Sequence, residues 1–215
     1  MGIPYDAIGE AGLRFFGKVS ASIAHEIKNV LAIINENAGL LEDLTFAAQR
    51  GSAIDPERLS KVCGQFTKQI QRADGIMKNM SHFAHSVDVF DTRADLYEVT
   101  CLVANLAARL AAMRKLTIEV VPAKTLVLFT GNPFLLQNLI WLCLEFAFGA
   151  TSAGSNLLLI PVNDDAGIAL RIGGIDSLDA GFAGKMPTGY EDLLAALGAK
   201  LSANCNTKEL ILHLP

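Results

Sequence analysis

Apolar side chains recur at intervals of three and four residues through most of residues 13–84. This spacing matches a helix of about 3.6 residues per turn, and it predicts one long amphipathic helix over residues 13–49. Residues 50–56 then interrupt the pattern with a glycine and an Asp-Pro pair, which are typical of a helix end followed by a new helix start. The first helix has apolar positions at Phe16, Val19, Ile23, Ile27, Val30, Ile34, Leu41 and Leu44. The second helix is expected from Pro56, with apolar positions at Leu59, Val62, Phe66, Ile70, Ala73, Met77, Met80 and Ala84.

Two long helices joined by a short loop are expected to lie antiparallel, and each presents a narrow apolar seam. Two such seams leave apolar surface uncovered, and pairing with a second copy of the chain closes a four-helix bundle. We therefore expect residues 1–88 to form a helical hairpin that makes a homodimer. The alternative is a hairpin that the C-terminal half of the same chain covers.

From residue 89 onward the pattern alternates between helices and strands. Residues 91–95 resemble a helix cap, and helices are expected over residues 96–114, 134–150 and 190–197. Residues 116–121 and 126–130 are interpreted as a strand pair, and further strands are expected over residues 156–162, 167–172, 201–204 and 209–214. This order predicts an α/β sandwich over residues 89–215, with helices on one face of a mixed sheet. The fold class of the chain is therefore α+β.

Composition excludes several classes of partner. The chain has 215 residues, 51% of them hydrophobic, and a net charge of −4, which argues against nucleic acid or an anionic membrane as the partner. The apolar segment 135–150 is too short to span a bilayer. The four cysteines are Cys63, Cys101, Cys143 and Cys205, and none of them forms a Cys-x-x-Cys pair. We therefore expect reduced cysteines in the core of a cytoplasmic protein, and no metal site. Because no segment is expected to span a membrane, we also expect the protein to be soluble.

His25 lies on the side of the first helix opposite its apolar seam. At about 100° per residue, its side chain is about 160° from those of Ile23 and Ile27. A polar strip with small residues surrounds it and is expected to receive another protein; its members are Lys18, Ser22, Lys28, Asn29, Ala32 and Glu36. For a histidine taken alone, a solvated helix face is the more common explanation.

Residues 25–31 read His-Glu-Ile-Lys-Asn-Val-Leu, which resembles the H box of two-component sensor histidine kinases. The resemblance implies that His25 is a phosphoacceptor and that Glu26 orients the imidazole and helps to take its proton. Asn29 would occupy the position that places a hydrolytic water in phosphatase-competent members. The chemistry is sound by itself, because a neutral imidazole is a good nucleophile for phosphorus and a carboxylate at one ring nitrogen leaves the other free.

The C-terminal half resembles the ATP-binding domain of the same family, but its nucleotide-binding residues are replaced. Asn132, Pro133, Leu136, Leu139, Ala147 and Ala150 match the framework of the N box, and residues 194–202 with the final Leu-His-Leu-Pro match the closing helix and strand. Leu142 and Phe146 stand where the family has asparagines, and neither offers an oxygen to Mg²⁺. Residues 172–176, Ile-Gly-Gly-Ile-Asp, stand in place of the Asp-x-Gly-x-Gly box. No cofactor is therefore expected, and Glu145 is the alternative ligand through which residual ATP binding would survive.

Together these features predict a histidine phosphotransferase that passes phosphate through His25 to or from receiver-domain aspartates. The alternatives are a non-catalytic pseudokinase that binds a receiver or a kinase, a receiver phosphatase that uses Asn29, and a divergent sensor kinase.

His82 and His85 are interpreted as polar residues near a helix C-terminus, where positive charge suits the helix dipole.

Overall fold

The computed structural model describes residues 5–90, 92–123, 125–165 and 167–215, with side chains from residue 9 onward. The chain divides by its contacts into two compact units. One unit is Ser20–Ser81, and the other combines Met1–Val19 with His82–Pro215. The sequence analysis predicted two domains, with the boundary between residues 88 and 89, and this boundary stays a prediction.

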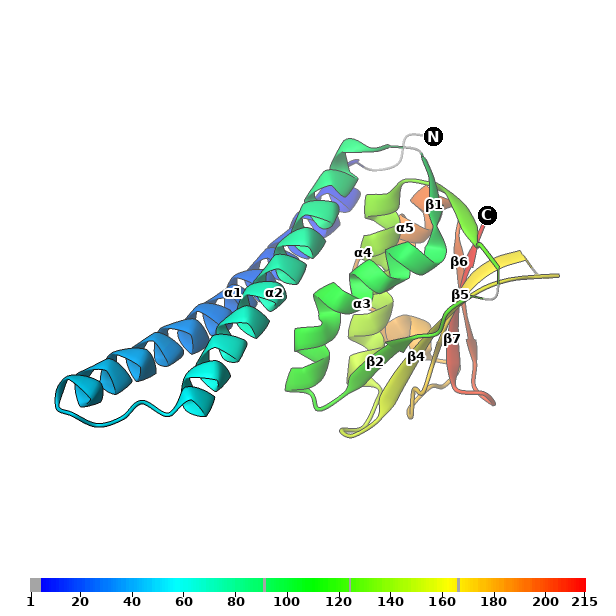
Figure 1. The fold of residues 1–215 in the computed structure, drawn as a ribbon. Coiled ribbons are helices and arrows are strands. Elements are labelled where there is room, and N and C mark those ends of the chain that lie inside the picture. Colours follow the sequence, from blue (N-terminus) through cyan, green and yellow to red (C-terminus); the bar gives the residue numbers. More distant parts are fainter. Residues whose placement is uncertain (1–4, 91, 124, 166) are drawn as a thin grey trace. The chain divides into compact units, whose positions relative to one another are not determined.

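The unit Ser20–Ser81 is a pair of antiparallel helices, formed by α1 (Tyr5–Gln49) and α2 (Pro56–His85) (Figure 1). Helix α1 begins earlier than the predicted residue 13, because the alanines and glycines of residues 7–12 give little apolar periodicity. Helix α2 begins at Pro56 as predicted. The Asp55 carboxylate caps it by accepting a hydrogen bond from the backbone N of Glu57 at 2.9 Å.

The apolar residues of α2 lie on two faces of the helix. Val62 and Ile76 are buried on one face, and the polar Gln69 is buried between them at intervals of seven residues. Leu59, Ile70 and Met77 lie about 100° away around the helix and are exposed, at 41%, 59% and 55%. The predicted seam of α2 merged these two faces, because apolar periodicity locates apolar surface without showing what covers it.

The C-terminal part of the other unit is built on a five-stranded mixed sheet with the order β2-β4-β5-β7-β6. These strands are β2 (Thr117–Val120), β4 (Asn156–Asp164), β5 (Gly167–Gly173), β7 (Glu209–Leu214) and β6 (Lys200–Asn204). Strand β2 runs parallel to β4, and the other neighbours are antiparallel. Helices α3 (Leu96–Met113), α4 (Pro133–Gly149) and α5 (Tyr190–Leu197) lie on one face of the sheet (Figure 1), which confirms the predicted α/β sandwich.

The predicted strand pair in residues 116–130 is wrong. Strand β3 (Leu128–Gly131) pairs antiparallel with β1 (Thr92–Asp95) in a separate two-stranded sheet, whereas β2 joins the main sheet beside β4. Both β2 and β3 pair with strands that lie more than 30 residues away in the sequence, and no local sequence signal predicts such pairing. Asp95 caps α3 by accepting from the backbone N of Tyr97 at 3.0 Å, while residue 91 of the predicted cap lies outside the described residues.

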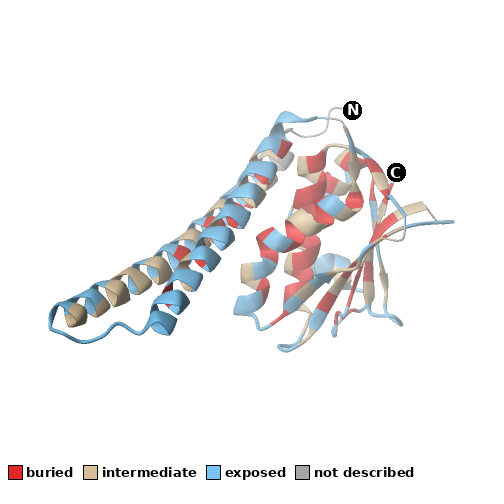
Figure 2. Cartoon of the chain, viewed as in Figure 1, coloured by how far each residue is buried: buried red, intermediate tan, exposed pale blue. Residues whose placement is uncertain are grey.

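The core gathers around α4, and Figure 2 shows burial concentrated in α3, α4 and the strands. Trp141 of α4 is buried in an aromatic cluster with Phe15, Phe83 and Phe134. Phe15 faces this cluster at 2% exposure, whereas the seam residue Phe16 is 37% exposed. The predicted seam placed Phe16 on the buried side of α1, but the buried residue is its neighbour Phe15.

Two further expectations concern membranes and cysteines. Helix α3 is long and apolar enough to span a bilayer by length and composition, but Leu96, Val103 and Ala107 of this helix are buried within the fold. The expectation of core cysteines is wrong for most of them. Cys143 is buried, and burial raises the pKa of its thiol to about 12, whereas Cys101 is half-buried and Cys63 and Cys205 are exposed.

Candidate functional site

Helix α1 places His25 in its middle, exposed to solvent. Ile23 and Val30 turn the opposite side of the helix into the fold, at 8% and 1% exposure. The 3.6-residue period therefore separates a buried side from the side that carries the imidazole. Because the backbone around His25 is in the interior of a continuous helix, the side chain stands on a rigid element.

Most of the predicted strip around His25 is exposed as expected. Lys28, Asn29, Ala32 and Glu36 are all accessible on α1. The prediction that Ser22 belongs to this exposed strip is wrong, because Ser22 is only 3% exposed. Its hydroxyl has no hydrogen-bond partner among the residues that the structure describes. It lies about 60° from His25 around the helix, and this offset turns it toward the buried side rather than the docking strip.

Glu26 contacts a residue that the sequence analysis missed. Its carboxylate Oε2 lies 4.0 Å from Nη2 of Arg72 on α2, and the side chain of Glu26 is only 18% exposed. The acidic neighbour of His25 is thus turned toward α2. No signal in the sequence assigns Arg72 to this place, because its contact depends on the pairing of two helix positions 46 residues apart in the chain.

The structure brings other histidines into a separate setting. His82 and His85 lie exposed at the end of α2, and Nδ1 of His85 is 3.2 Å from Oδ2 of Asp88. This agrees with polar residues at a helix C-terminus. In the part of the chain that the structure describes, no group of three or more His, Cys, Asp or Glu side chains is arranged to hold a metal ion.

The positions that correspond to the N box are apolar. Leu142 and Phe146 of α4 are buried at 7% and 6% exposure, and the Phe146 ring packs edge-on against Phe182 with the centroids 6.3 Å apart. Hydrocarbon side chains supply no ligand for Mg²⁺ and no hydrogen bond to a phosphate. At these two positions this chain therefore has no polar group that could bind a nucleotide.

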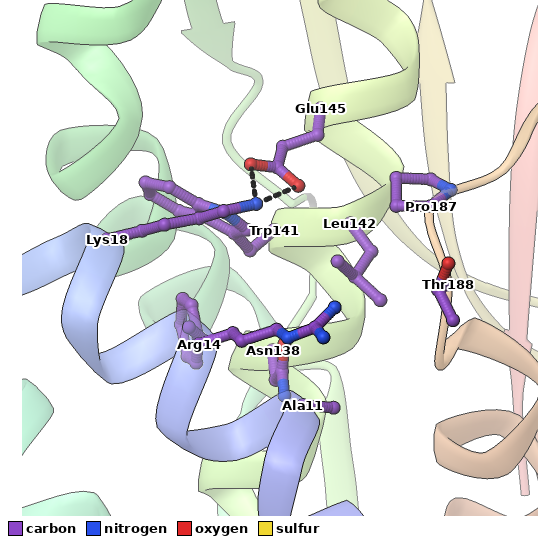
Figure 3. Close-up of a pocket in the computed structure, with 10 residues that line it drawn as sticks. Ala11, Arg14, Lys18, Asn138, Trp141, Leu142, Glu145, Pro187 and Thr188 are labelled. Carbon is purple, nitrogen blue, oxygen red and sulfur yellow. Dashed lines mark hydrogen bonds and ion pairs between the residues drawn. The ribbon is translucent and has the colours of Figure 1, made fainter. Parts of the chain in front are cut away.

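Glu145, the alternative metal ligand, is already paired. Nζ of Lys18 on α1 lies 2.5 and 2.8 Å from its two carboxylate oxygens, and both side chains line a cavity of about 100 Å³ with Leu142 (Figure 3). Asn138 and Trp141 also line this cavity, and the side-chain amide of Asn138 and the indole N–H have no hydrogen-bond partners in the described part of the chain. A small polar cavity of this kind suits ordered water. The ion pair would have to break before Glu145 reached a metal.

The paired glycines at the end of β5 have a structural role. Gly174 has a φ of +84°, and a Cβ there would lie 2.3 Å from the backbone oxygen of Asn156. Asp176 accepts a hydrogen bond from the backbone N of Ser152 at 2.7 Å, and this bond holds the pKa of the carboxyl below its usual value. Gly174 therefore lets the chain pass close to β4, and the Asp176 carboxylate joins the segment after β5 to the segment before β4.

Comparisons with known proteins give a fold likeness only. No protein-family model matches the chain, and no curated protein matches it. The similar solved structures include segments of histidine kinases. Histidine kinase AdeS of Acinetobacter baumannii is 13% identical, with 87% of this chain and 94% of that chain covered and a TM-score of 0.44. The ATP-binding domain of PrrB from Mycobacterium tuberculosis is 18% identical, covering 58% and 96%, with a TM-score of 0.46. A bacterial phosphotransferase is 15% identical, covering 93% and 95%, with a TM-score of 0.48.

Proposed function

We propose that this chain is a histidine phosphotransferase of a two-component phosphorelay, and that His25 carries the phosphoryl group. The observation that carries the proposal is an exposed histidine in the middle of α1 with Glu26 and Asn29 beside it. The apolar side chains of Leu142 and Phe146 support a protein that receives phosphate from another protein rather than from ATP. The C-terminal domain is then kept for structure or for docking.

In this proposal the partner is the receiver domain of a response regulator with a phosphorylated aspartate. A ring nitrogen of His25 attacks the phosphorus, the N–P bond forms, and the bond from phosphorus to the acyl oxygen breaks, so the aspartate leaves as a carboxylate. Glu26 holds the other ring nitrogen and accepts its proton as positive charge develops. Lys28, exposed about 60° away around α1, supplies positive charge near the phosphoryl group. The transfer is reversible, so the same residues serve both directions.

The proposed protein acts in the cytoplasm as a homodimer. The receiver docks on the exposed strip that contains His25, Lys28, Asn29, Ala32 and Glu36. Neither nucleic acid nor a membrane is a partner in this proposal, in keeping with the net charge of −4.

The test is incubation with a panel of receiver domains that carry a radioactive phosphoryl group. We expect label to move to this protein, and His25→Gln to abolish the transfer while its melting temperature stays nearly unchanged, because substitution at an exposed helix position changes stability by about 0.5 kcal/mol or less. His82→Gln, at another exposed histidine, is the matched control and should transfer normally. Label on the His25→Gln protein would contradict the assignment.

The other functions give different outcomes in the same assay. Release of the label as inorganic phosphate, lost in Asn29→Ala, would indicate a phosphatase, for which the exposed amide of Asn29 is one turn from His25. Label that stays on a receiver bound by the protein would indicate a non-catalytic regulator. Label on His25 from Mg·ATP alone, or binding of Mg·ATP in calorimetry at submillimolar concentration, would indicate a divergent kinase.

A further inference from the structure

The contact between Arg72 and Glu26 links α2 directly to the residue beside His25. Nη2 of Arg72 lies 4.0 Å from Oε2 of Glu26, and the two side chains are 47% and 18% exposed. We propose that Arg72 is a positioning residue, which holds the Glu26 carboxylate where it orients the His25 imidazole. This inference rests on the proposed phosphotransfer function, and it adds a residue from the second helix to the site.

The helix positions explain why these two side chains meet. Glu26 lies three residues after Ile23 and four before Val30, and both of these are buried. Residues three and four apart share a helix face, so Glu26 emerges at the edge of the buried side of α1. It is also about 100° from His25 around the helix, so in this proposal the imidazole and the carboxylate turn toward each other to meet.

Arg72 has the corresponding place on α2. It lies three residues after Gln69 and four before Ile76, which are buried at 6% and 9% exposure. Its guanidinium therefore starts from the face of α2 that is turned into the helix pair. The other ion pair described within Ser20–Ser81, between Lys78 and Asp74, lies along α2 alone and fixes nothing on α1. Among the described pairs of this unit, the Arg72–Glu26 contact joins the two helices.

The chemistry of the contact suits an orienting role. A free glutamate side chain on a helix surface samples several rotamers, and a nearby cation favours those that keep the carboxylate beside it. The contact uses Oε2 of Glu26, which leaves Oε1 free to accept a hydrogen bond from the ring N–H of His25. Because His25 is exposed, its ring can rotate onto this oxygen without disturbing the fold. The ring is then held in the tautomer whose other nitrogen attacks phosphorus.

The first test is a double-mutant cycle in the receiver transfer assay. We expect Arg72→Ala to lower the rate at saturating receiver about fivefold, as for loss of a partly exposed ion pair, with the half-saturating receiver concentration unchanged. Glu26→Gln should lower the rate at least as much, and adding Arg72→Ala to it should have no further effect. Arg72→Lys should recover most of the rate because it keeps the charge, and Lys78→Ala is the control at another paired cation of α2.

The second test needs no receiver, so it separates this inference from the proposed function. The ¹⁵N shifts of the His25 ring report its tautomers, and we expect Arg72→Ala and Glu26→Gln to move them in the same direction, with no change in Lys78→Ala. Unchanged ring shifts, a wild-type transfer rate in Arg72→Ala, or a full additional loss in the Glu26→Gln background would overturn the positioning role. Shifts that move as expected in a protein that accepts no label would support the contact and refute the phosphotransfer function.

Discussion

Side chains on α1 differ in exposure within a single turn of the helix. His25 is exposed, whereas Ser22, three residues earlier, is buried with an unpartnered hydroxyl. A buried hydroxyl without a hydrogen bond lowers stability, because folding removes its water and replaces it with nothing. The polar residues near His25 therefore differ in setting, since Lys28, Asn29 and Glu36 are exposed to solvent and Ser22 is buried.

We predict that Ser22→Ala stabilises the protein by about 1 kcal/mol, because it removes the unpartnered hydroxyl and introduces a better helix former. Ser81→Ala is the control, since Ser81 is exposed on α2 and reports the helix propensity alone. The measurement is chemical denaturation of both variants beside the wild type. Equal effects of the two substitutions would show that the Ser22 hydroxyl has a partner in solution.

A second residue-scale prediction concerns Glu209 of β7. Burial raises the pKa of this carboxyl, but hydrogen bonds from Arg171 at 2.6 Å and Thr207 at 2.7 Å, with the Arg171 charge, outweigh burial and leave the pKa below its usual 4.5. A carboxyl with a lowered pKa in the folded state stabilises the fold above its unfolded pKa, and this stabilisation is lost as the pH falls through the folded pKa.

Glu209→Gln should therefore destabilise the protein by about 1 kcal/mol at pH 7, and the difference from wild type should shrink below pH 4.5. Denaturation at a series of pH values measures it. The exposed Glu42→Gln is the control and should show no such pH dependence. A difference that stays constant down to pH 2 would mean that the lost packing, rather than the charge, causes the effect.

At the scale of elements, the turn after β5 fixes how closely β5 approaches β4. Gly174 and Gly154 both have positive φ, at +84° and +92°, but their surroundings differ. A Cβ at residue 174 would collide with the backbone of Asn156, whereas nothing lies within 4 Å of a Cβ at residue 154. The pair therefore separates backbone strain from steric collision.

We predict that Gly154→Ala costs about 1 kcal/mol, the strain of a left-handed residue, and that Gly174→Ala costs about 3 kcal/mol or more. The free energy of unfolding of each variant gives the two values, and their difference is the cost of the collision. Similar values would mean that β4 moves away from the new methyl group at little expense.

At the scale of the whole molecule, exposed apolar residues on both long helices support the proposed homodimer. They include Leu31 of α1 at 58% exposure and the α2 face formed by Leu59, Ile70 and Met77. Ile70 and Met77 are seven residues apart, a spacing that places side chains on one face of a helix in a bundle. A second copy of the chain would cover this face.

We predict that Ile70→Asp makes the protein monomeric, because a charge inside a helix bundle costs several kcal/mol when it has no partner. Light scattering should then give the chain mass of 23.0 kDa instead of twice that value. The unfolding of the helix pair itself should change little, since Ile70 is exposed in the single chain. Leu126→Asp, at a 63% exposed loop residue, is the control and should stay dimeric. A wild-type mass of 23.0 kDa would refute the dimer.

The sequence determined the features that depend on local periodicity. The 3.6-residue period gave both long helices and placed His25 on the exposed side of α1, and short apolar runs gave β4 and β5. Local capping likewise marked the start of α2 at Pro56. Each of these results follows from residues that lie within a few positions of one another.

Tertiary structure decided the features that depend on residues far apart in the chain. It put β2 beside β4, buried Phe15 more deeply than Phe16, and separated the buried face of α2 from its exposed face. It also buried Ser22 and brought Arg72 to Glu26. Periodicity fixes the direction of a side chain from its own helix axis, but only the packing of a second element determines what that side chain meets.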